Sequence, residues 1–447
     1  MASVAAGAGT DTGRGGLEGQ PRGLWVLAGT EFWERVSFHG MQALLVLYMV
    51  EQLLLPGHAE HVAGLAAVRG AVEAATGPLS AQAFASQLFG LYVGFVYFTP
   101  AIGGWIGDRV IGRRAAVVVG GLLMAAGHLS LAFDKTFLAA LGLLVAGAGL
   151  LRGNLLAEVG ALYTPQDRRR AEGVQLYYTG INVGAFVAPI ATGALGQAYG
   201  WHAGFAFAAG GMLIGVAIYL AGRGAVPAQQ HGARGEQRPL TPAERRSVGR
   251  LAVLGLIAVS YWTAQTQVWN TYNIWARDHL DRVIGAFTMP VPWLQGFDAL
   301  APVLMLPFVL RWWRVRAQTG RESGELTKAA IGCLLFALGM AWLGAAGAGR
   351  VPLLWGIAFH MVSNLGWIYF NPVVLAVFTR AAPAPRAATV IACYQLSVFV
   401  GSIVSGRLGG FYERWGPADF WFVHAGIAAA GSVAVLALRG WLRRALG

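Results

Sequence analysis

Long apolar runs recur along the whole length of this chain, and they restrict its possible folds more than any other feature. A helix needs about 20 consecutive apolar residues to cross a hydrocarbon core of roughly 30 Å. The runs are continuous rather than alternating, so they predict transmembrane α-helices and not the strands of a membrane barrel. Twelve are expected, at residues 24–52, 85–107, 114–133, 137–163, 173–197, 202–222, 249–275, 288–311, 327–347, 352–378, 387–410 and 418–438.

The composition agrees with a protein embedded in lipid. Only 12% of the residues are charged and 56% are hydrophobic, which is far from the balance of a soluble domain. The net charge of +12 does not indicate a nucleic-acid partner, because the basic residues are scattered through short loops where they meet anionic lipid headgroups. Cys333 and Cys393 both lie in predicted transmembrane segments without the spacing of a metal or redox site.

The basic residues also predict the orientation of the chain. With the amino terminus inside, the cytoplasmic segments hold 24 Lys and Arg residues and the opposite side holds 6. The positive-inside rule therefore predicts a multi-pass protein of the inner membrane with both termini in the cytoplasm. The polar, Gly-rich residues 1–23 contain no apolar core of a signal peptide, so we expect a disordered tail there.

Six predicted segments precede the longest basic loop, and six follow it. This layout predicts an all-α protein of two six-helix bundles that meet around a central cavity, as in transporters built from repeats. The pattern LAAVRGAVEAA in the outer loop at 53–84 favours one amphipathic helix outside the membrane. The expected parts are a cytoplasmic tail at 1–23, bundles at 24–222 and 249–438, a cytoplasmic linker at 223–248 and a second tail at 439–447.

The first segment contains the stretch TEFWERVSFHGMQ, in which Glu31, Glu34 and Arg35 share one side of a helix. At about 1.5 Å per residue they lie near the middle of the membrane, where a charge costs at least about 2.5–3.5 kcal/mol. An ion pair between helices would explain one acid and one base, but the surplus carboxylate favours a functional role. Arg152, in the fourth segment, is its natural partner, and Asp298 is the one acid of the second half placed inside a segment away from the loops.

Several polar-tipped side chains accompany these charges. His39 lies one turn after Arg35 and can titrate near neutral pH, although an ordinary hydrogen-bonded histidine explains it equally well. Tyr92, Tyr177, Tyr394 and Trp367 also fall in predicted segments, and such residues often serve only as anchors at the membrane interface.

With these residues in view, the chain resembles the proton-coupled oligopeptide transporters, a branch of the major facilitator superfamily. EFWERVSFHGM is similar to the E-x-x-E-R signature of that family, and YFTPAIGGWIGDRVIGRR resembles its second helix and the following loop. LYYTGINVGAFVAP and YGWHAGFAFAAGGM resemble its fifth and sixth helices. YWTAQTQVWNTYNIWARDHLDR and PWLQGFDALAP resemble the seventh and eighth, so the resemblance runs from about residue 24 to 438.

The resemblance implies roles for individual residues. Glu31, Glu34, Arg35 and Arg152 would couple transport to protons, with the two arginines also meeting the carboxylate of the substrate. Arg152 replaces the lysine of the family's K-P-N motif, and Asn154 keeps its last residue. The expected substrate-binding residues are Arg35, His39, Tyr92, Arg152, Asn154, Tyr177, Asn182, Gln267, Asp298, Trp367 and Tyr394.

The sequence departs from the family pattern at positions that would contact a substrate. Phe38 and His39 replace a Tyr-Tyr pair, and Thr266 replaces an acid of the seventh helix. Trp367 replaces the tenth-helix glutamate expected to bind the amino group of a peptide, and Asp298 replaces an asparagine. These changes bear on the identity of the substrate more than on proton coupling.

Residues and resemblance together predict a proton-coupled symporter that imports di- or tripeptides, or related small zwitterionic solutes, by alternating access. Its partners would be the solute, protons and the lipid bilayer, with no cofactor and no metal. The sequence contains no Ser-His-Asp array, metal-ligand cluster or nucleotide loop, so no enzymatic activity is expected. Proton-coupled efflux, import of a non-peptide solute and a non-transporting membrane sensor on the same fold remain alternatives.

Overall fold

Long helices make up nearly all of the protein. The computed structural model of the chain describes residues 19–164, 166–227, 238–383 and 387–444, and these ranges hold twelve long helices. They are α1 (Arg22–Tyr48), α3 (Ala81–Ile106), α4 (Arg113–Ser130), α5 (Phe137–Ala161), α6 (Arg170–Tyr199), α7 (Trp201–Gly222), α8 (Pro242–Thr266), α10 (Pro292–Gln318), α11 (Glu325–Ala345), α12 (Leu353–Ala381), α13 (Ala387–Gly409) and α14 (Tyr412–Arg443).

Short elements connect the long helices. Two are short α-helices and five are single turns, namely α2 (Leu65–Thr76), α9 (Thr271–His279), η2 (Met49–Leu53), η3 (Ala59–His61), η4 (Gly107–Ile111), η5 (Asp134–Thr136) and η6 (Arg223–Ala225). Two-residue strands form a parallel pair, β1 (Leu280–Asp281) with β4 (Val351–Pro352), and an antiparallel pair, β2 (Val283–Ile284) with β3 (Phe287–Thr288). Helix α2 lies in the loop where the sequence pattern predicts an amphipathic helix.

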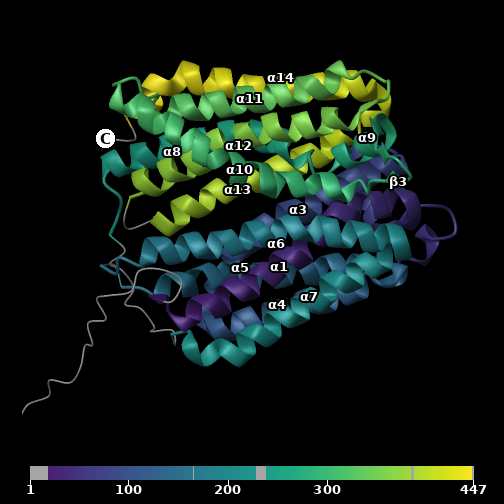
Figure 1. Ribbon diagram of the computed structural model, residues 1–447, viewed down its shortest axis with the longest axis horizontal. Helices are drawn as coiled ribbons and strands as arrows, with labels where there is room; N and C mark the ends of the chain where they lie inside the picture. The colour runs from purple at the N-terminus through teal and green to yellow at the C-terminus, as the bar shows by residue number, and fades with distance from the viewer. Residues whose placement is uncertain (1–18, 165, 228–237, 384–386, 445–447) are drawn as a thin grey trace, which may run out of the picture.

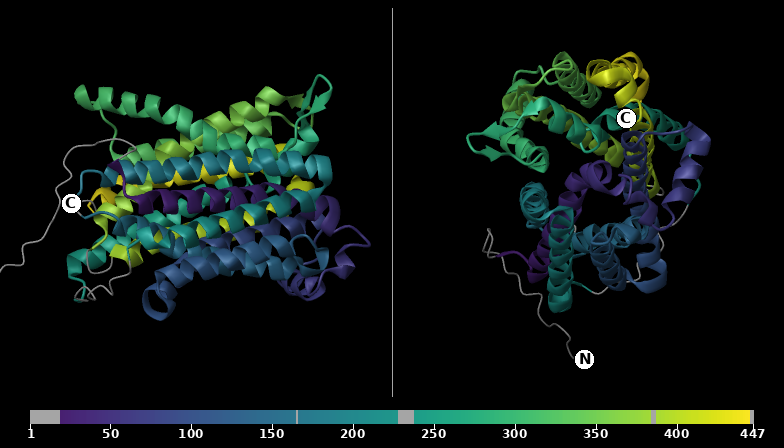
Figure 2. Two further views of the ribbon diagram at one scale, coloured as in Figure 1. Left: turned by 60° about the horizontal axis from the view of Figure 1, so that its bottom comes forward. Right: turned by 90° about the vertical axis from the view of Figure 1, so that its right-hand side faces the viewer.

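The helices form two bundles, one from each half of the chain (Figure 1). In the N-terminal bundle α1 packs against α6 and α7, and in the C-terminal bundle α11 packs against α12 and α14. The end-on view of Figure 2 shows the two groups of helices facing each other. They meet where α3 contacts α13 and where α6 contacts α10. The predicted all-α architecture of twelve helices in two bundles is confirmed.

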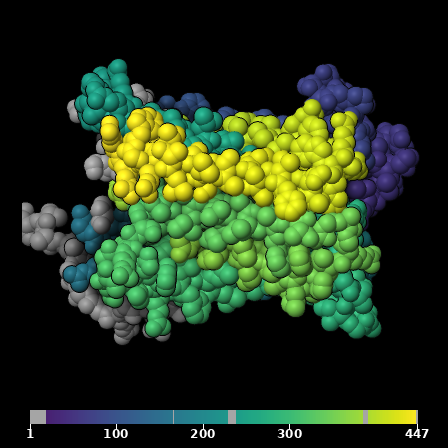
Figure 3. All heavy atoms as spheres, turned by 90° about the horizontal axis from the view of Figure 1, so that it is seen from above, coloured from purple at the N-terminus to yellow at the C-terminus, as the bar shows by residue number. Residues whose placement is uncertain are grey.

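The outer surface of the bundles is suited to lipid. Ten helices in the described ranges are long and apolar enough to cross a membrane by length and composition. Figure 3 shows the face where α14 runs beside α11, and large apolar side chains such as Leu338, Phe422 and Val433 are exposed on these two helices. Apolar surface of this kind is stable when acyl chains cover it.

Helix ends in the structure extend past several predicted segments, because hydropathy detects only the part of a helix that lies in lipid. Helix α8 begins at Pro242, ahead of the segment expected at 249. Thr241 and Glu244 form a capping box at this end, which satisfies the first backbone N–H groups in water. Helix α14 likewise runs to Arg443, beyond the segment expected to end at 438.

The single segment predicted at 249–275 is wrong in one respect, because the helix is broken within it. Helix α8 ends at Thr266 and α9 starts at Thr271, with Asn270 in a non-helical conformation between them. The break frees the carbonyl of Val268, and Gln295 of α10 donates its Nε2–H to that oxygen at 2.6 Å. A polar side chain from a neighbouring helix thus replaces the lost helical hydrogen bond, which is a condition for irregular backbone inside a membrane.

Polar contacts join the two bundles at the end that carries α2. Among the described residues, every hydrogen bond or ion pair between the bundles lies at this end. They are Glu51–Arg277, Ser80–Glu413, Gln82–Gly409, Ser86–Asn270, Ile190–Trp293, Gln197–Thr288 and Thr76–Arg407. These links therefore hold the two bundles together at the α2 end.

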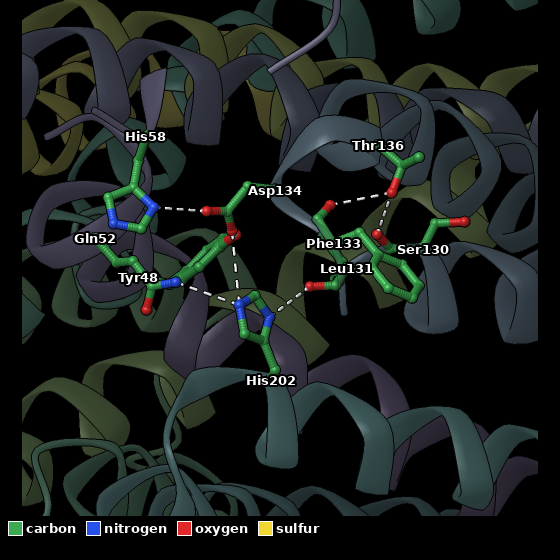
Figure 4. Close-up of polar contacts among 9 residues, drawn as sticks. All are labelled: Tyr48, Gln52, His58, Ser130, Leu131, Phe133, Asp134, Thr136 and His202. Carbon is green, nitrogen blue, oxygen red and sulfur yellow. Dashed lines mark hydrogen bonds and ion pairs between the residues drawn. The ribbon is translucent and has the colours of Figure 1, made fainter. Parts of the chain in front are cut away.

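A polar cluster inside the N-terminal bundle fixes the loops at the same end (Figure 4). Asp134 accepts hydrogen bonds from Tyr48 at 2.5 Å and from His58 at 2.8 Å. His202, at the start of α7, lies 3.6 Å from the same carboxylate and contacts Gln52 at 3.2 Å. The cluster ties η2, the loop after it and the α4–α5 connection to α7, and it lies outside the contacts between the bundles.

Close helix crossings depend on glycine, and one of them gives a test of the packing. A Cβ atom on Gly103 of α3 would lie 2.1 Å from the carbonyl oxygen of Gly149 on α5. We expect Gly103→Ala to force α3 and α5 apart at a cost of about 1–3 kcal/mol and to lower the thermal unfolding midpoint in detergent. Gly142→Ala on α5, where a Cβ meets nothing within 4 Å, is the matched control and should leave the midpoint unchanged or slightly higher. Equal midpoints for the two variants would contradict this account of the crossing.

Candidate functional site

Two acids and two bases meet inside the N-terminal bundle. The Nε atom of Arg35 lies 2.9 Å from Glu31 Oε1 and 2.6 Å from Glu34 Oε2. Arg152 of α5 donates its Nε–H to Glu34 Oε1 at 2.9 Å, and its Nη2 is also 2.9 Å from that oxygen. Glu34 therefore lies between the two arginines and connects α1 to α5. The sequence predicts Arg152 as the partner of the surplus carboxylate, and the structure places it against Glu34.

Burial makes this cluster dependent on its internal balance. The side chain of Glu34 is 0% exposed, and those of Glu31, Arg152 and Arg35 are 6%, 12% and 14% exposed. Removing one partner from such a network leaves an uncompensated charge, which costs about 3–5 kcal/mol in buried ion pairs. Two carboxylates and two guanidinium groups have no net charge when all are ionised. Any added proton or charged ligand must therefore change the pairing.

Aromatic groups complete the surroundings of the cluster. The guanidinium carbon of Arg152 lies 3.9 Å from the ring centre of Phe38, and that of Arg35 lies 5.9 Å from it. The ring of Phe38 thus lies close to both cations and can stabilise them through its face. Tyr177 of α6 donates its hydroxyl to Glu31 Oε2 at 2.9 Å, so it belongs to the same group.

The cluster faces a cavity between the bundles. This space of about 460 Å³ is lined by Arg35 and Arg152 of the N-terminal bundle and by Ala392, Cys393, Gln395 and Leu396 of α13. A second cavity of about 290 Å³ adjoins it, since Tyr97 and Gln395 line both. The lining of the second cavity includes the predicted residues His39, Asn182, Asp298, Trp367 and Tyr394. Charged and polar side chains of both bundles therefore line one region made of two adjoining cavities.

Asp298 is the carboxylate of the C-terminal side of this region. Its Oδ1 accepts from His360 Nδ1 at 2.8 Å and from Asn364 Nδ2 at 3.0 Å, both on α12. No hydrogen bond among the described residues reaches its second oxygen, Oδ2. Trp367 of α12 and Thr266 of α8 line the same cavity as Asp298. The carboxylate thus keeps one oxygen for a ligand while the other is held in place.

Four predicted binding residues lie outside both cavity linings, namely Tyr92, Asn154, Tyr177 and Gln267. Asn154 donates to the carbonyls of Gly103 and Leu150, so its amide holds α5 against α3. Gln267 lies in the break after α8 and donates to the carbonyl of Ser405, which fixes that turn to α13. Tyr92 is buried within the N-terminal bundle. This placement gives Asn154 and Gln267 a packing role, and it does not support the substrate contacts predicted for them.

The structure adds residues that the sequence analysis missed. His360 and Asn364 belong to the Asp298 site, and Asn371 accepts the hydroxyl of Tyr394 at 2.8 Å in the same cavity. A signal for them was present, because residues 360, 364, 367 and 371 follow a helical spacing in an otherwise apolar segment. Among the described residues no cluster of three or more His, Cys, Asp or Glu side chains is suited to a metal ion.

Comparisons with known proteins agree with this arrangement. The model of the POT family matches residues 114–235 and 232–416. The peptide transporter YePEPT of Yersinia enterocolitica is 28% identical over 474 residues, covering 88% of each chain. A di-/tripeptide transporter of Lactococcus lactis is 26% identical over 502 residues, covering 96% of this chain and 97% of the relative.

Solved structures show the same fold. A peptide transporter variant in complex with alafosfalin is 26% identical, with a TM-score of 0.79 and 97% of each chain covered. A POT family transporter in complex with 5-aminolevulinic acid reaches a TM-score of 0.83 at 21% identity, with 96% of this chain and 98% of that chain covered, which shows likeness of fold alone. The family model spans well over half of the sequence, and this chain belongs to the POT family, whose members have the major facilitator fold.

Proposed function

We propose that this protein imports di- or tripeptides, or closely related small zwitterions, together with protons. One observation carries the proposal: the balanced cluster around Glu34 and the carboxylate of Asp298 border one region between the two bundles. The cluster offers guanidinium groups for a carboxylate, and Asp298 offers an anion for an ammonium group. A zwitterion that spans the region satisfies both ends.

Proton coupling follows from charge balance within the cluster. Arg35 and Arg152 are fully compensated by Glu31 and Glu34 when no substrate is bound. A substrate carboxylate that binds to the arginines adds a negative charge in a buried site. A proton on Glu31 or Glu34 removes that excess, so substrate and proton bind favourably together. This linkage is the basis of symport.

The contacts at the α2 end support transport by alternating access. With the termini placed in the cytoplasm by the positive-inside rule, the α2 end faces outward, and the described polar links between the bundles close this side. Rocking of the two bundles would break these links and open the region to the outside. The structure then corresponds to an inward-facing or occluded state of a protein of the inner membrane.

Uptake measurements test the proposed function. The purified protein is reconstituted into proteoliposomes and supplied with labelled dipeptides, tripeptides and amino acids, with and without an inward proton gradient. Accumulation of a peptide that depends on the gradient supports the proposal. Gradient-driven loss of preloaded peptide would instead show efflux, and gradient-dependent uptake of non-peptide solutes alone would show a different substrate class.

The first prediction for transport concerns Glu34, which contacts both arginines. We expect Glu34→Gln to abolish uphill uptake driven by a proton gradient and to leave some counterflow exchange, because the glutamine cannot gain or lose a proton. Glu60→Gln, on an exposed loop, is the control and should accumulate peptide like the unmodified protein. Unchanged accumulation by Glu34→Gln would place the coupling elsewhere.

The second concerns Arg152 and its geometry. Its Nε and Nη2 both approach Glu34, and its guanidinium carbon lies 3.9 Å from the ring centre of Phe38, an arrangement that a lysine ammonium cannot reproduce in full. We expect Arg152→Lys to keep part of the uptake rate and Arg152→Gln to keep almost none. Equal rates in the two variants would argue against a role for the charge.

The third concerns Asp298 as the site of the amino group. Loss of a charge-assisted hydrogen bond costs about 1.5–3 kcal/mol, so Asp298→Asn should weaken binding of peptides with free amino termini roughly tenfold or more. Peptides with acetylated amino termini should bind to the variant and to the unmodified protein alike. Equal losses for both kinds of peptide, measured by competition for uptake, would count against the assignment.

A further inference from the structure

Asp298 has an unusual partner for a carboxylate inside a membrane protein. In the N-terminal bundle each buried acid of the cluster faces an arginine, whereas Asp298 contacts only His360 and Asn364 among the described residues. An amide supplies no charge, so compensation for an ionised Asp298 depends on the state of the imidazole. His360 is 0% exposed, and its Nδ1 lies 2.8 Å from the carboxylate oxygen.

Aromatic rings enclose the imidazole. The centroids of Tyr272 of α9, Phe297 of α10 and Phe359 of α12 lie 5.1, 6.1 and 5.2 Å from that of His360. Such a shell has a low dielectric, which strengthens the attraction between an imidazolium and Asp298 and disfavours an uncompensated carboxylate. The other ring nitrogen, Nε2, is buried without a hydrogen-bond partner in the described structure.

Other titratable groups around the pair supply no positive charge. Tyr272 of α9 and Tyr261 of α8 lie within electrostatic reach of Asp298. Helix α11 faces this part of α12 with Gly339, which packs against Ser363. No Lys or Arg forms a hydrogen bond or ion pair with Asp298 or His360 in the ranges that the structure describes. The positive charge beside Asp298 therefore comes from a proton on His360 or from a ligand in the cavity.

These two sources are alternatives. With His360 protonated and Asp298 ionised the pair is neutral, and an ammonium group would then be an excess charge in a buried site. With His360 neutral the pair carries one negative charge, which an ammonium group at the second oxygen of Asp298 compensates. We propose that His360 is a second proton-binding residue of the transporter, protonated while the amine site is empty and deprotonated when a substrate ammonium group binds Asp298.

The inference rests on the proposed function, in which Asp298 receives the amino group of the substrate. In the proposed step the imidazolium loses one N–H proton to the aqueous phase, and the electron pair of that bond stays on the imidazole nitrogen. The substrate ammonium group replaces the lost positive charge beside Asp298, so the charge of this part of the site is unchanged. A substrate without an amino group has no such effect, and His360 stays protonated.

Proton release on binding tests the proposal. The full-length protein in detergent is mixed at about pH 6 with saturating alanyl-alanine or N-acetyl-alanyl-alanine in weakly buffered solution, and a pH indicator records the protons released or taken up per bound molecule. Both peptides have a carboxylate, so the contribution of the arginine cluster is common to them. We expect up to about one more proton to be released with alanyl-alanine than with the acetylated peptide.

Variants assign that difference to His360. His360→Gln keeps a hydrogen-bonding side chain but cannot be protonated, and we expect the difference between the two peptides to vanish. His58→Gln removes an exposed histidine that contacts Asp134 and lines neither cavity, and it should keep the full difference. Asp298→Asn provides a second test if His360→Gln does not fold, because His360 without the neighbouring anion should no longer be protonated in the empty site.

The outcomes separate this inference from the proposed function. A difference in proton release that persists in either His360→Gln or Asp298→Asn would overturn the role of His360. So would binding of both peptides to the unmodified protein with equal proton release, although the proposed function would stand. Failure of the unmodified protein to bind either peptide would overturn the proposed function and this inference with it.

Discussion

The site depends on one carboxylate, that of Glu34, which is fully buried between two guanidinium groups. A lone charge at that depth is unstable, so Glu34 requires Arg35 from its own helix and Arg152 from α5 to be in position together. The pairing joins the charged residues of α1 to Arg152 in the middle of α5, and the ring of Phe38 lies close to both arginines. Because the four charges compensate one another, a proton or a substrate carboxylate changes the balance of the whole group.

The two bundles compensate buried charge in different ways. The N-terminal bundle encloses equal numbers of acids and bases, whereas the C-terminal bundle presents Asp298 with a histidine and an amide. A permanent arginine would occupy the carboxylate in every state of the cycle. A histidine is charged only when protonated, so it would suit the proposed role of Asp298, which is to bind an ammonium group and then release it. Trp367 adds a ring face to this cavity but no charge.

Much of this architecture follows from the sequence, because hydropathy and buried charge are strong local signals. An apolar run of this length requires lipid or a protein core around it. Charged residues within such a run, here Glu31, Glu34 and Arg35, require a partner of opposite charge such as Arg152. The break after Thr266 was not predicted, although Gln265, Gln267, Asn270 and Asn273 make this part of the segment polar, because the apolar residues on either side were interpreted as one continuous span. Asn154 and Gln267 were assigned from their places in family motifs, but only the packed helices show that their amides are used by neighbouring backbone. The helical spacing of His360, Asn364, Trp367 and Asn371 was a signal in the sequence, but only the packing of α10 against α12 places Asp298 beside His360.

The break between α8 and α9 connects the substrate region to the closed end of the molecule. Gln295 and Asp298 are three residues apart on α10, so they lie on one side of that helix. Gln295 holds the freed carbonyl of Val268 in the break, and α9 beyond the break carries Arg277, which pairs with Glu51 of the opposite bundle at 3.1 Å. Asn270, within the break, donates to the carbonyl of Ser86 across the same interface. In the proposed transport cycle, a shift of α10 on ligand binding at Asp298 would therefore act on the turn that positions two of the links between the bundles.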